Sequence, residues 1–308
     1  MPAVKTAIRQ QPAWLTRAGD YLTLCKPKVV LLMIFTAWVG MFLAAPGTLP
    51  LNALLFGSLG IALSAGAAAA LNHVIDRHID ARMYRTRNRP LPRGELSPWR
   101  CVAFAAITGT LGMAILFAFV NALTAWLTLA SLIGYAVVYT LWLKRATPQN
   151  IVIGGIAGAT PPLLGWTAVT GQVDPYPLLL VLIIFTWTPP HFWALAIYRK
   201  EDYARVGIPM LPVTHGEDFT RLQILLYTIL LSVVTVLPWL IGEHGALYLF
   251  GVLLIDGVFL WYAWTLYRHP RRELALKTFV YSITYLFLLF ALLLGDRVVL
   301  PMLLDWAA

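Results

Sequence analysis

The sequence predicts an all-α membrane protein with nine transmembrane helices. Of its 308 residues, 59% are hydrophobic and only 12% are charged, whereas a soluble domain usually carries about 25% charged residues. Apolar windows recur along the chain, and several reach the roughly 20 residues that an α-helix needs to cross a bilayer core. A polytopic helical membrane protein is the class that fits this composition, with the lipid bilayer as its surroundings.

The apolar windows alternate with short polar segments whose charges predict the orientation. The windows cover approximately residues 29–46, 52–75, 101–120, 122–143, 150–170, 176–198, 221–241, 246–267 and 277–300. Of the 23 Lys and Arg residues, all but Arg297 fall in the N-terminal tail or in the even-numbered gaps and their edges. The positive-inside rule therefore places the N-terminus in the cytoplasm and, after nine crossings, the C-terminus outside.

The chain reads as one membrane domain, residues 29–300, between two tails. The N-terminal tail, residues 1–28, is basic and lacks the apolar run of a signal peptide; its short length favours a bacterial inner membrane over a mitochondrial one. The C-terminal tail is residues 301–308. Two long segments, 76–100 and 199–220, lie on the predicted cytoplasmic side, and the connections on the other side are short. We therefore expect the active site on the cytoplasmic side.

The distribution of charge argues against a nucleic-acid-binding protein, and the cysteines argue against a disulfide-rich or thiolate-metal protein. The net charge of +9 is distributed in short segments between apolar windows, as membrane topology requires, so it does not indicate a nucleic-acid partner. Cys25 and Cys101 are the two cysteines, far apart in sequence. They support neither a disulfide framework nor a thiolate metal site.

Asn72, Asp76 and Asp80 form the most informative pattern, because they recur at every fourth position where an apolar window ends. On a helix each four-residue step rises about 6 Å and drifts about 40° around the axis, so the three side chains share a face. Carboxylate and amide oxygens suit Mg²⁺, which usually keeps positions for water and substrate phosphate. The pattern therefore predicts a magnesium site that binds a diphosphate.

Several arginines follow this face, and their guanidinium groups can hold phosphate oxygens in pairs. They are Arg82, Arg85, Arg87, Arg89 and Arg93. Together with the metal they would stabilise a departing diphosphate. For most of these arginines a solvated loop that obeys the positive-inside rule is an equally good interpretation.

Four blocks of sequence resemble a known enzyme family. "NHVIDRHID" fits the N-x-x-x-D-x-x-x-D motif of the UbiA-type intramembrane prenyltransferases, and "RMYRTRNRPLPRGELSP" follows it. This continuation is similar to the protohaem IX farnesyltransferase (haem O synthase) branch. "LCKPKVVLLMIFTAWVG", "GGIAGATPPLLGW" and "TPPHFWALAIYRKEDYARVGIPMLPV" match the same branch. The resemblance extends from about residue 20 to residue 295.

The resemblance implies a UbiA-type helical bundle that transfers a farnesyl group from farnesyl diphosphate to a vinyl group of haem B, with addition of water, to give haem O. It implies Mg²⁺ as the cofactor, and haem A synthase or a terminal oxidase assembly as a further partner. The predicted metal ligands are Asn72, Asp76 and Asp80. The predicted catalytic residues are Asp76, Asp80, Arg85, Arg89, Lys200 and His191. The predicted substrate-binding residues are Asn72, Arg82, Arg93, Lys144, Tyr198, Asp202 and Tyr203.

The second cytoplasmic segment departs from the family pattern. Many family members carry a second aspartate-rich motif here, but Glu201 and Asp202 are adjacent and would point about 100° apart on a helix. Binding of a second metal is therefore in doubt, and Lys200 is a candidate counter-charge for phosphate. His191 lies within an apolar run, and both a haem ligand and a base are open roles for it.

Two other readings remain open from sequence. One is a UbiA-type enzyme that acts on a quinone precursor or a chlorophyllide. The other is a protein without turnover, either a haem carrier or a transporter. A transporter would carry several charged residues in mid-span, but only Asp256 and His191 lie deep within a window.

Overall fold

The computed structural model describes residues 13–45, 50–299 and 301, so much of the predicted N-terminal tail and almost all of the C-terminal tail lie outside the described residues. Within these residues all regular secondary structure is helical, and nine helical spans are long and apolar enough to cross a membrane. The predicted all-α class and the number of spans are confirmed. The sidedness of the two termini stays a prediction.

The described chain contains the following helices. In chain order they are α1 (Ala13–Leu24), α2 (Pro27–Ala44), η1 (Ala53–Gly57), α3 (Ser58–Asp80), α4 (Pro98–Phe119), α5 (Ala122–Ile133), η2 (Gly134–Leu143), α6 (Lys144–Ala146), α7 (Asn150–Ala159), α8 (Pro161–Thr170), α9 (Pro175–Tyr198), α10 (Lys200–Arg205), α11 (Leu211–Thr214), α12 (Gly216–Leu240), α13 (Ala246–Arg268), α14 (Arg272–Leu294) and η3 (Gly295–Val299). Elements η1, η2 and η3 are π-helical, and each continues directly into or from an α-helix within one span.

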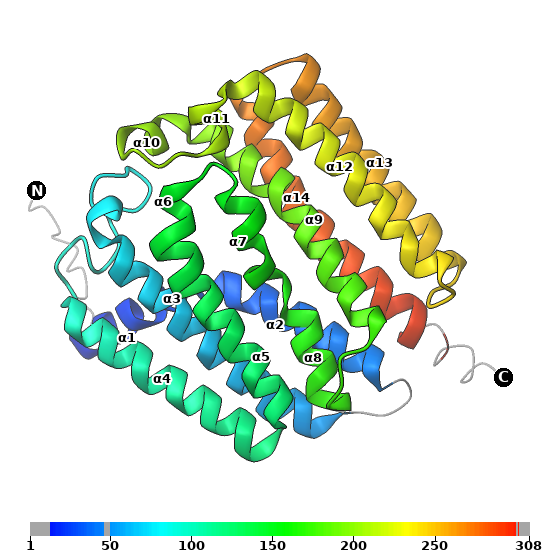
Figure 1. The fold of residues 1–308 in the computed structure, drawn as a ribbon, viewed down its shortest axis with the longest axis horizontal. Helices are drawn as coiled ribbons and strands as arrows, with labels where there is room; N and C mark the ends of the chain where they lie inside the picture. The colour runs from blue at the N-terminus through cyan, green and yellow to red at the C-terminus, as the bar shows by residue number, and fades with distance from the viewer. Residues whose placement is uncertain (1–12, 46–49, 300, 302–308) are drawn as a thin grey trace, which may run out of the picture.

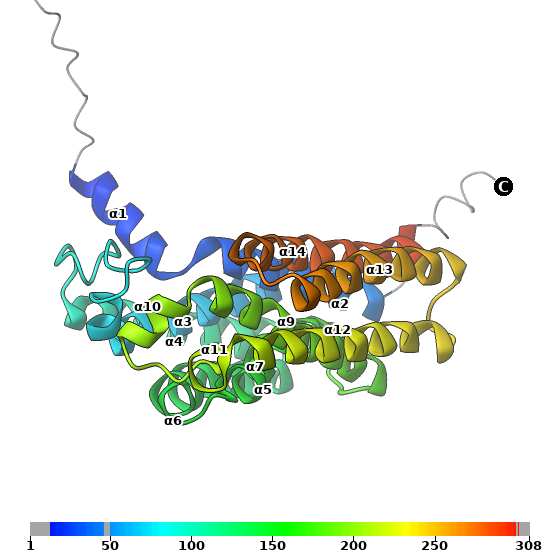
Figure 2. The ribbon, with the colours of Figure 1, turned by 90° about the horizontal axis from the view of Figure 1, so that it is seen from above.

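The long helices run side by side between two ends of the bundle (Figures 1 and 2). One end, which we call the α10 end, carries residues 81–97, α10 and α11. The described connections at the opposite end are short, such as residues 241–245 between α12 and α13. Helix α3 packs against α4, and α9 packs against both α12 and α14. The two long segments noted in the sequence therefore lie at the same end.

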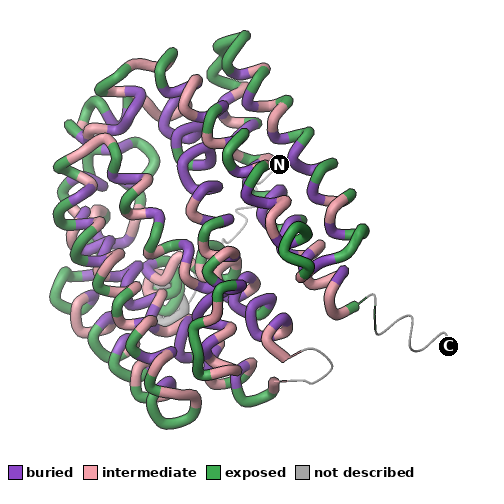
Figure 3. The backbone as a smooth tube through the Cα atoms, turned by 45° about the vertical axis from the view of Figure 1, so that its right-hand side comes forward, coloured by how far each residue is buried: buried purple, intermediate pink, exposed green. Residues whose placement is uncertain are grey.

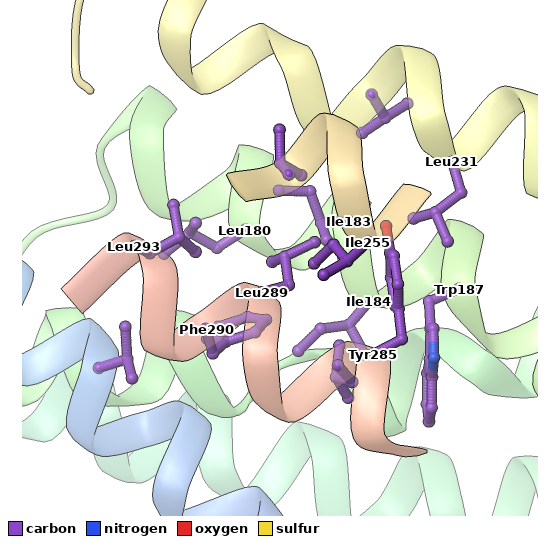
Figure 4. Close-up of a cluster of buried hydrophobic side chains, with 14 of the residues drawn as sticks. Leu180, Ile183, Ile184, Trp187, Leu231, Ile255, Tyr285, Leu289, Phe290 and Leu293 are labelled. Carbon is purple, nitrogen blue, oxygen red and sulfur yellow. The ribbon is translucent and has the colours of Figure 1, made fainter. Parts of the chain in front are cut away.

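Helix α9 is the most buried span, with 67% of its apolar window inside the protein. It is apolar on every side, as expected of a helix surrounded by others. Leu180, Ile183 and Ile184 on α9 pack against Leu231 on α12 and Leu289 on α14 in the largest hydrophobic cluster (Figure 4). Burial is concentrated on the inward faces of the helices, and the outward faces are exposed apolar surface that suits lipid (Figure 3).

Two helices extend beyond the apolar windows. Helix α3 continues through Asp80 instead of ending near residue 75, and α4 begins at Pro98 instead of residue 101. A hydropathy window ends where charge begins, but a helix continues as long as its backbone hydrogen bonds are satisfied. Ser97 caps α4 by accepting a hydrogen bond from the backbone N–H of Arg100. The whole Asn72–Asp80 motif is therefore helical.

A buried polar cluster holds the opposite end together. The Asp296 carboxylate accepts hydrogen bonds from the backbone N–H groups of Gly245 and Tyr248, at 2.7 and 3.1 Å, and so caps the start of α13. His244 Nδ1 donates to the same carboxylate, and Tyr176 donates to His244 Nε2. Burial lowers the pKa of His244, although its hydrogen bond to Asp296 acts in the opposite direction. These contacts are mutually satisfied and serve the fold.

Helices α2 and α8 cross closely because glycines line the crossing. A Cβ atom added at Gly165 would overlap the backbone carbonyl of Ala37, and one added at Gly40 would overlap the carbonyl of Pro162. Backbone carbonyls cannot rotate away as flexible side chains can. The crossing distance of this pair therefore depends on the absence of a side chain at these positions.

The substitution Gly165→Ala should destabilise the protein by about 1–2 kcal/mol, because overpacking outweighs the gain in helix propensity. Gly158→Ala is the matched control, since Gly158 is also helical and nothing lies within 4 Å of an added Cβ. Thermal unfolding in detergent should show a lower midpoint for Gly165→Ala and an equal or higher midpoint for Gly158→Ala. Equal midpoints for both variants would contradict the close-crossing interpretation.

Candidate active site

Asn72 and Asp76 form the centre of the site on α3. Both are buried, with 4% and 1% of their surface exposed. The Asn72 amide donates a hydrogen bond to Asp76 Oδ2 at 2.9 Å and lies 3.3 Å from the hydroxyl of Thr140 on η2. This contact spans four residues, so it is the direct consequence of the helical spacing in the sequence.

Three cations surround this helix face and neutralise it. Lys144 Nζ donates to Asp76 Oδ2 at 2.5 Å, and Lys26 Nζ donates to Asn72 Oδ1 at 2.7 Å. Arg89 Nη1 donates to Asp80 Oδ2 at 2.6 Å from the loop that follows α3. Each anionic or amide group of the predicted metal face thus has a cationic partner, and the pairs are well placed for a charge-rich ligand.

Lys26 is a site residue that the sequence analysis did not identify. It precedes Pro27 and has left-handed backbone angles, φ 51° and ψ 60°, the only such residue other than glycine in the described chain. A non-glycine residue in this region is strained, and such strain often accompanies function. Its ammonium group also contacts the phenol of Tyr135 at 3.2 Å. The available signal was a lysine directly before the proline that opens a span.

Two aromatic residues of η2 complete this side of the site. The rings of Tyr135 and Tyr139 stack with centroids 5.7 Å apart. Tyr139 lies within electrostatic range of Asp76, Arg85 and Tyr203, which come from three different segments. The first and second segments of the α10 end and the end of α3 therefore come together around Tyr139 on η2. Sequence spacing gave no signal for Tyr135, because tertiary packing alone places it there.

The donor set fits a magnesium ion. Asp76 Oδ1 is buried and has no hydrogen-bond partner in the described part of the chain, so one carboxylate oxygen is free for a ligand. Mg²⁺ commonly takes one or two carboxylates and completes its shell with water and phosphate. No group of three or more His, Cys, Asp or Glu side chains within the described residues could hold a metal by itself. An open, oxygen-only site is therefore the type that this chain offers.

The remaining residues of the first segment differ in their surroundings. Arg82 Nε donates to the backbone carbonyl of His78, and Arg93 pairs with Glu95 in an exposed position. Arg85 lies within electrostatic range of Tyr139. His73 is buried beside Asn72, and neither of its ring nitrogens has a hydrogen-bond partner among the described residues. Arg82 and Arg93 therefore lie at the rim, whereas Arg89 is part of the centre.

The second segment lies beside the first. A cavity of about 320 Å³ at the α10 end is lined by residues of the first segment, the second segment and the start of α14. They are Tyr84, Tyr198, Arg199, Glu201, Asp202, Arg205 and Arg272. Asp202 lies 3.9 Å from Arg199, and Glu201 pairs with Arg272, so the adjacent acids face different arginines. Tyr203 is buried, but Lys200 pairs with Glu217 on α12 at 3.2 Å.

His191 lies deeper on α9, away from the charged groups. Its imidazole stacks on Trp187 with centroids 4.2 Å apart and lies 4.6 Å from the ring of Phe279 on α14. Its Nδ1 lies 2.6 Å from the hydroxyl of Ser282. The structure therefore separates a charged cluster at the end of α3 from an aromatic cluster around one histidine.

Comparisons with known proteins identify the family and the fold. A curated relative from Azotobacter vinelandii strain DJ, a protoheme IX farnesyltransferase, is 63% identical over 278 residues, which are 90% of this chain and 93% of the relative. A solved structure of digeranylgeranylglyceryl phosphate synthase has a TM-score of 0.77 at 18% identity and covers 92% of this chain and 99% of its own. A UbiA homologue from Archaeoglobus fulgidus bound to DMAPP and Mg²⁺ has a TM-score of 0.61 at 16% identity, over 89% of this chain and 99% of its own.

The family model of the UbiA prenyltransferases matches residues 32–294, which include all nine candidate spans in whole or in part. The resemblance noted in the sequence motifs is therefore confirmed across the chain. The protein belongs to the UbiA prenyltransferase family.

Proposed function

We propose that this protein transfers the farnesyl group of farnesyl diphosphate to a vinyl group of haem B, with addition of water, and releases haem O and diphosphate. One observation carries this proposal. The oxygen ligands Asn72, Asp76 and Asp80 face Lys26, Lys144 and Arg89 at one end of α3, in a chain that is 63% identical to a protoheme IX farnesyltransferase. This identity favours haem B over a quinone precursor or a chlorophyllide.

The cation cluster binds the diphosphate in this proposal. Lys26, Lys144 and Arg89 exchange their present oxygen partners for phosphate oxygens, and Arg85 adds charge beside Tyr139. Arg82 and Arg93 contribute from the rim. As the bond between C1 of the farnesyl group and the bridging oxygen breaks, the electron pair leaves with the diphosphate. Preorganised cations stabilise this growing charge more strongly in a water-poor site than in bulk water.

Asn72, Asp76 and Asp80 are the proposed ligands of Mg²⁺. The bound ion supplies positive charge to the diphosphate oxygens and so makes diphosphate a better leaving group. The related structure from Archaeoglobus fulgidus holds DMAPP together with Mg²⁺, which supports a divalent ion here. The free Oδ1 of Asp76 is the first coordinating atom in this proposal.

The second substrate approaches C1 from the side of α9 and α10. The vinyl π bond of haem B forms the new carbon–carbon bond to C1, which leaves a cation on the vinyl carbon next to the macrocycle. Water adds to this cation and loses a proton, which gives the hydroxyl group of the product. Tyr198, Asp202 and Tyr203 border the haem in this proposal, and Lys200 leaves Glu217 for phosphate. His191 lies on the haem side.

The α10 end faces the cytoplasm of a bacterial inner membrane in this proposal, because the basic residues concentrate at that end. The membrane domain is residues 29–300, and segments 76–100 and 199–220 form its cytoplasmic active-site face. Both substrates are amphiphiles, so a bundle that opens to lipid can admit them while it limits bulk water. A haem A synthase or a terminal oxidase assembly is the proposed recipient of the product.

A product assay tests the assignment. Purified protein is incubated with Mg²⁺, farnesyl diphosphate and either haem B or 4-hydroxybenzoate, and the products are identified by mass. The expected result is a farnesylated, hydrated haem and no farnesylated benzoate. Product from 4-hydroxybenzoate alone would move the protein to the quinone-precursor branch, and haem binding without turnover would make it a carrier.

Asp76→Asn should reduce haem O formation at least about a hundredfold, the scale expected when one preorganised electrostatic group at a reacting centre is lost. The change is nearly isosteric and keeps a hydrogen-bond acceptor, so folding is spared. Glu273→Gln is the control, because Glu273 is exposed at the first turn of α14. Normal product formation by a monodisperse Asp76→Asn protein would refute the metal-site assignment.

Lys144→Met should lower kcat about tenfold to a hundredfold, since it removes the cation nearest to Asp76. Arg145→Met is a matched control in the same turn, because Arg145 is adjacent and exposed. Steady-state kinetics with farnesyl diphosphate as the varied substrate will compare the two variants. If kcat falls equally in both variants, the loss results from removing positive charge from this loop and not from removing the contact with Asp76.

Removal of divalent ions should stop the reaction without unfolding the protein. EDTA is expected to abolish haem O formation, and excess Mg²⁺ is expected to restore it, because the proposed ligands are all oxygen atoms. Circular dichroism measured in parallel will report the helical content, which should not change. Full activity after exhaustive chelation would show that the lysine and arginine side chains alone stabilise the leaving group.

A further inference from the structure

The contact between His191 and Ser282 joins α9 to α14 in an apolar part of the bundle. His191 Nδ1 lies 2.6 Å from Ser282 Oγ. His191 has only 8% of its surface exposed, and Ser282 is fully buried. A buried polar contact between two spans constrains both partners, because no water is available to replace either one.

The hydrogen bonds of Ser282 determine which nitrogen of His191 carries the proton. The Ser282 hydroxyl donates to the backbone carbonyl of Phe279 at 2.6 Å. A hydroxyl has a single proton, so towards His191 it acts as an acceptor. Nδ1 of His191 therefore donates, and in the neutral ring Nε2 then carries a lone pair. No hydrogen-bond partner of Nε2 occurs within the described residues.

The imidazole is also held in one orientation. Trp187 stacks on it, with ring planes 20° apart, and Phe279 lies 4.6 Å away. Trp187 Nε1 donates to the backbone carbonyl of Ser282 at 2.8 Å, which fixes α9 relative to α14 at the same level. The imidazole ring therefore has a defined tautomer, and the lone pair of Nε2 has a defined direction.

We propose that Nε2 of His191 is the axial ligand of the iron of the haem substrate, and that Ser282 is the positioning residue that keeps Nδ1 protonated. This inference rests on the proposed function for the identity of the ligand. A ring nitrogen that binds metal usually has its other N–H donated to a fixed acceptor, which sets the tautomer and the ring orientation. The neutral imidazole of His is a common haem ligand.

The surroundings favour a metal ligand over a general base. The ring contacts Trp187, Phe192, Phe279 and the Ser282 hydroxyl, and none of these groups carries the negative charge that would offset a buried imidazolium. A histidine that acts as a base usually has a carboxylate that stabilises the cation it becomes. A ligand needs no such partner, because the ring stays neutral when it binds iron.

The position of His191 is consistent with separate binding sites for the haem and the diphosphate. It precedes Tyr198 by seven residues on α9, which corresponds to about 10 Å along the helix axis. The iron would therefore lie within the apolar part of the bundle, deeper than the cavity that Tyr198 lines. The charged cluster around Asp76 remains free for the diphosphate.

The test is a titration of the purified, full-length protein in detergent with ferric haem B, followed by its absorption and electron paramagnetic resonance spectra. Wild type should give the spectrum of an imidazole-ligated haem, and His191→Ala should lose it. Ser282→Ala should weaken haem binding about tenfold to a hundredfold, the usual cost of losing an outer-shell partner. Ser282→Thr keeps the hydroxyl and should restore most of the affinity.

Two controls separate ligation from packing. Ser232→Ala removes a hydroxyl that donates to the carbonyl of Thr228 on α12, and it should bind haem as wild type does. Metal-free protoporphyrin IX has no iron to ligate, so its affinity should be the same for wild type and Ser282→Ala. The proposal is overturned if Ser282→Ala keeps the wild-type spectrum and affinity, or if it weakens haem and metal-free protoporphyrin equally.

The same preparations distinguish this inference from the proposed function. Haem O formation by wild type, together with unchanged haem spectra in His191→Ala and Ser282→Ala, would reject the axial ligand and leave the function standing. Imidazole-ligated haem that depends on Ser282, without haem O under any condition, would support the ligand and reject the transferase assignment.

Discussion

Neutralisation of the Asp76 carboxylate is the interaction on which the site depends. Asp76 is almost completely buried within a transmembrane helix, where an unpaired carboxylate costs several kcal/mol. Lys144 supplies the counter-charge at 2.5 Å, and the Asn72 amide adds a hydrogen bond. Because Lys26, the residue before α2, in turn binds Asn72, contacts around one acidic group join the start of α2, the end of α3 and the start of α6.

This neutralisation also leaves the cluster able to change partners. A buried ion pair roughly balances the desolvation of its two charges, so its net contribution to stability is small. The lysines that pair with Asp76 and Asn72 can move to phosphate oxygens when a diphosphate enters, since the diphosphate carries more negative charge than a carboxylate or an amide oxygen. Asp76 Oδ1 has no partner to lose. Binding of the diphosphate therefore breaks fewer hydrogen bonds than it would if every polar atom of the cluster already had a partner.

Local sequence patterns predicted the parts of the site that a single helix determines. The four-residue spacing of Asn72 and Asp76 gave their shared face, and the observed hydrogen bond between them follows from that spacing. Hydropathy gave the nine spans, because lipid imposes a length and an apolar composition on each one. Lys26 and Tyr135 were not predicted, since their roles depend on how α2 and η2 pack against α3. Lys200 illustrates the same limit, because its partner Glu217 comes from α12.

Hydrogen-bond accounting separates the two ionisable residues that lie deep in the spans. Both carboxylate oxygens of Asp256 are occupied, one by the hydroxyl of Tyr285 at 2.5 Å and the other by Thr235 at 2.8 Å. His191 has one nitrogen engaged by Ser282 and one without a partner in the described structure. Asp256, whose hydrogen bonds are satisfied, joins helices. His191 is held in place with one nitrogen that can still bind a ligand.

This difference explains how one bundle can serve two unlike substrates. A diphosphate requires several cations at an interface where counter-ions can exchange, and the end of α3 provides them. The proposed ligation of haem requires apolar surface and a directed lone pair on His191, and the Trp187–His191–Phe279 cluster would provide both. If the two kinds of group were mixed, the charges would carry water into the haem pocket and expose the farnesyl cation to premature hydrolysis. In the proposed reaction, the separation of the end of α3 from the interior of α9 would keep the reacting carbon atoms at the boundary between the charged end and the apolar interior.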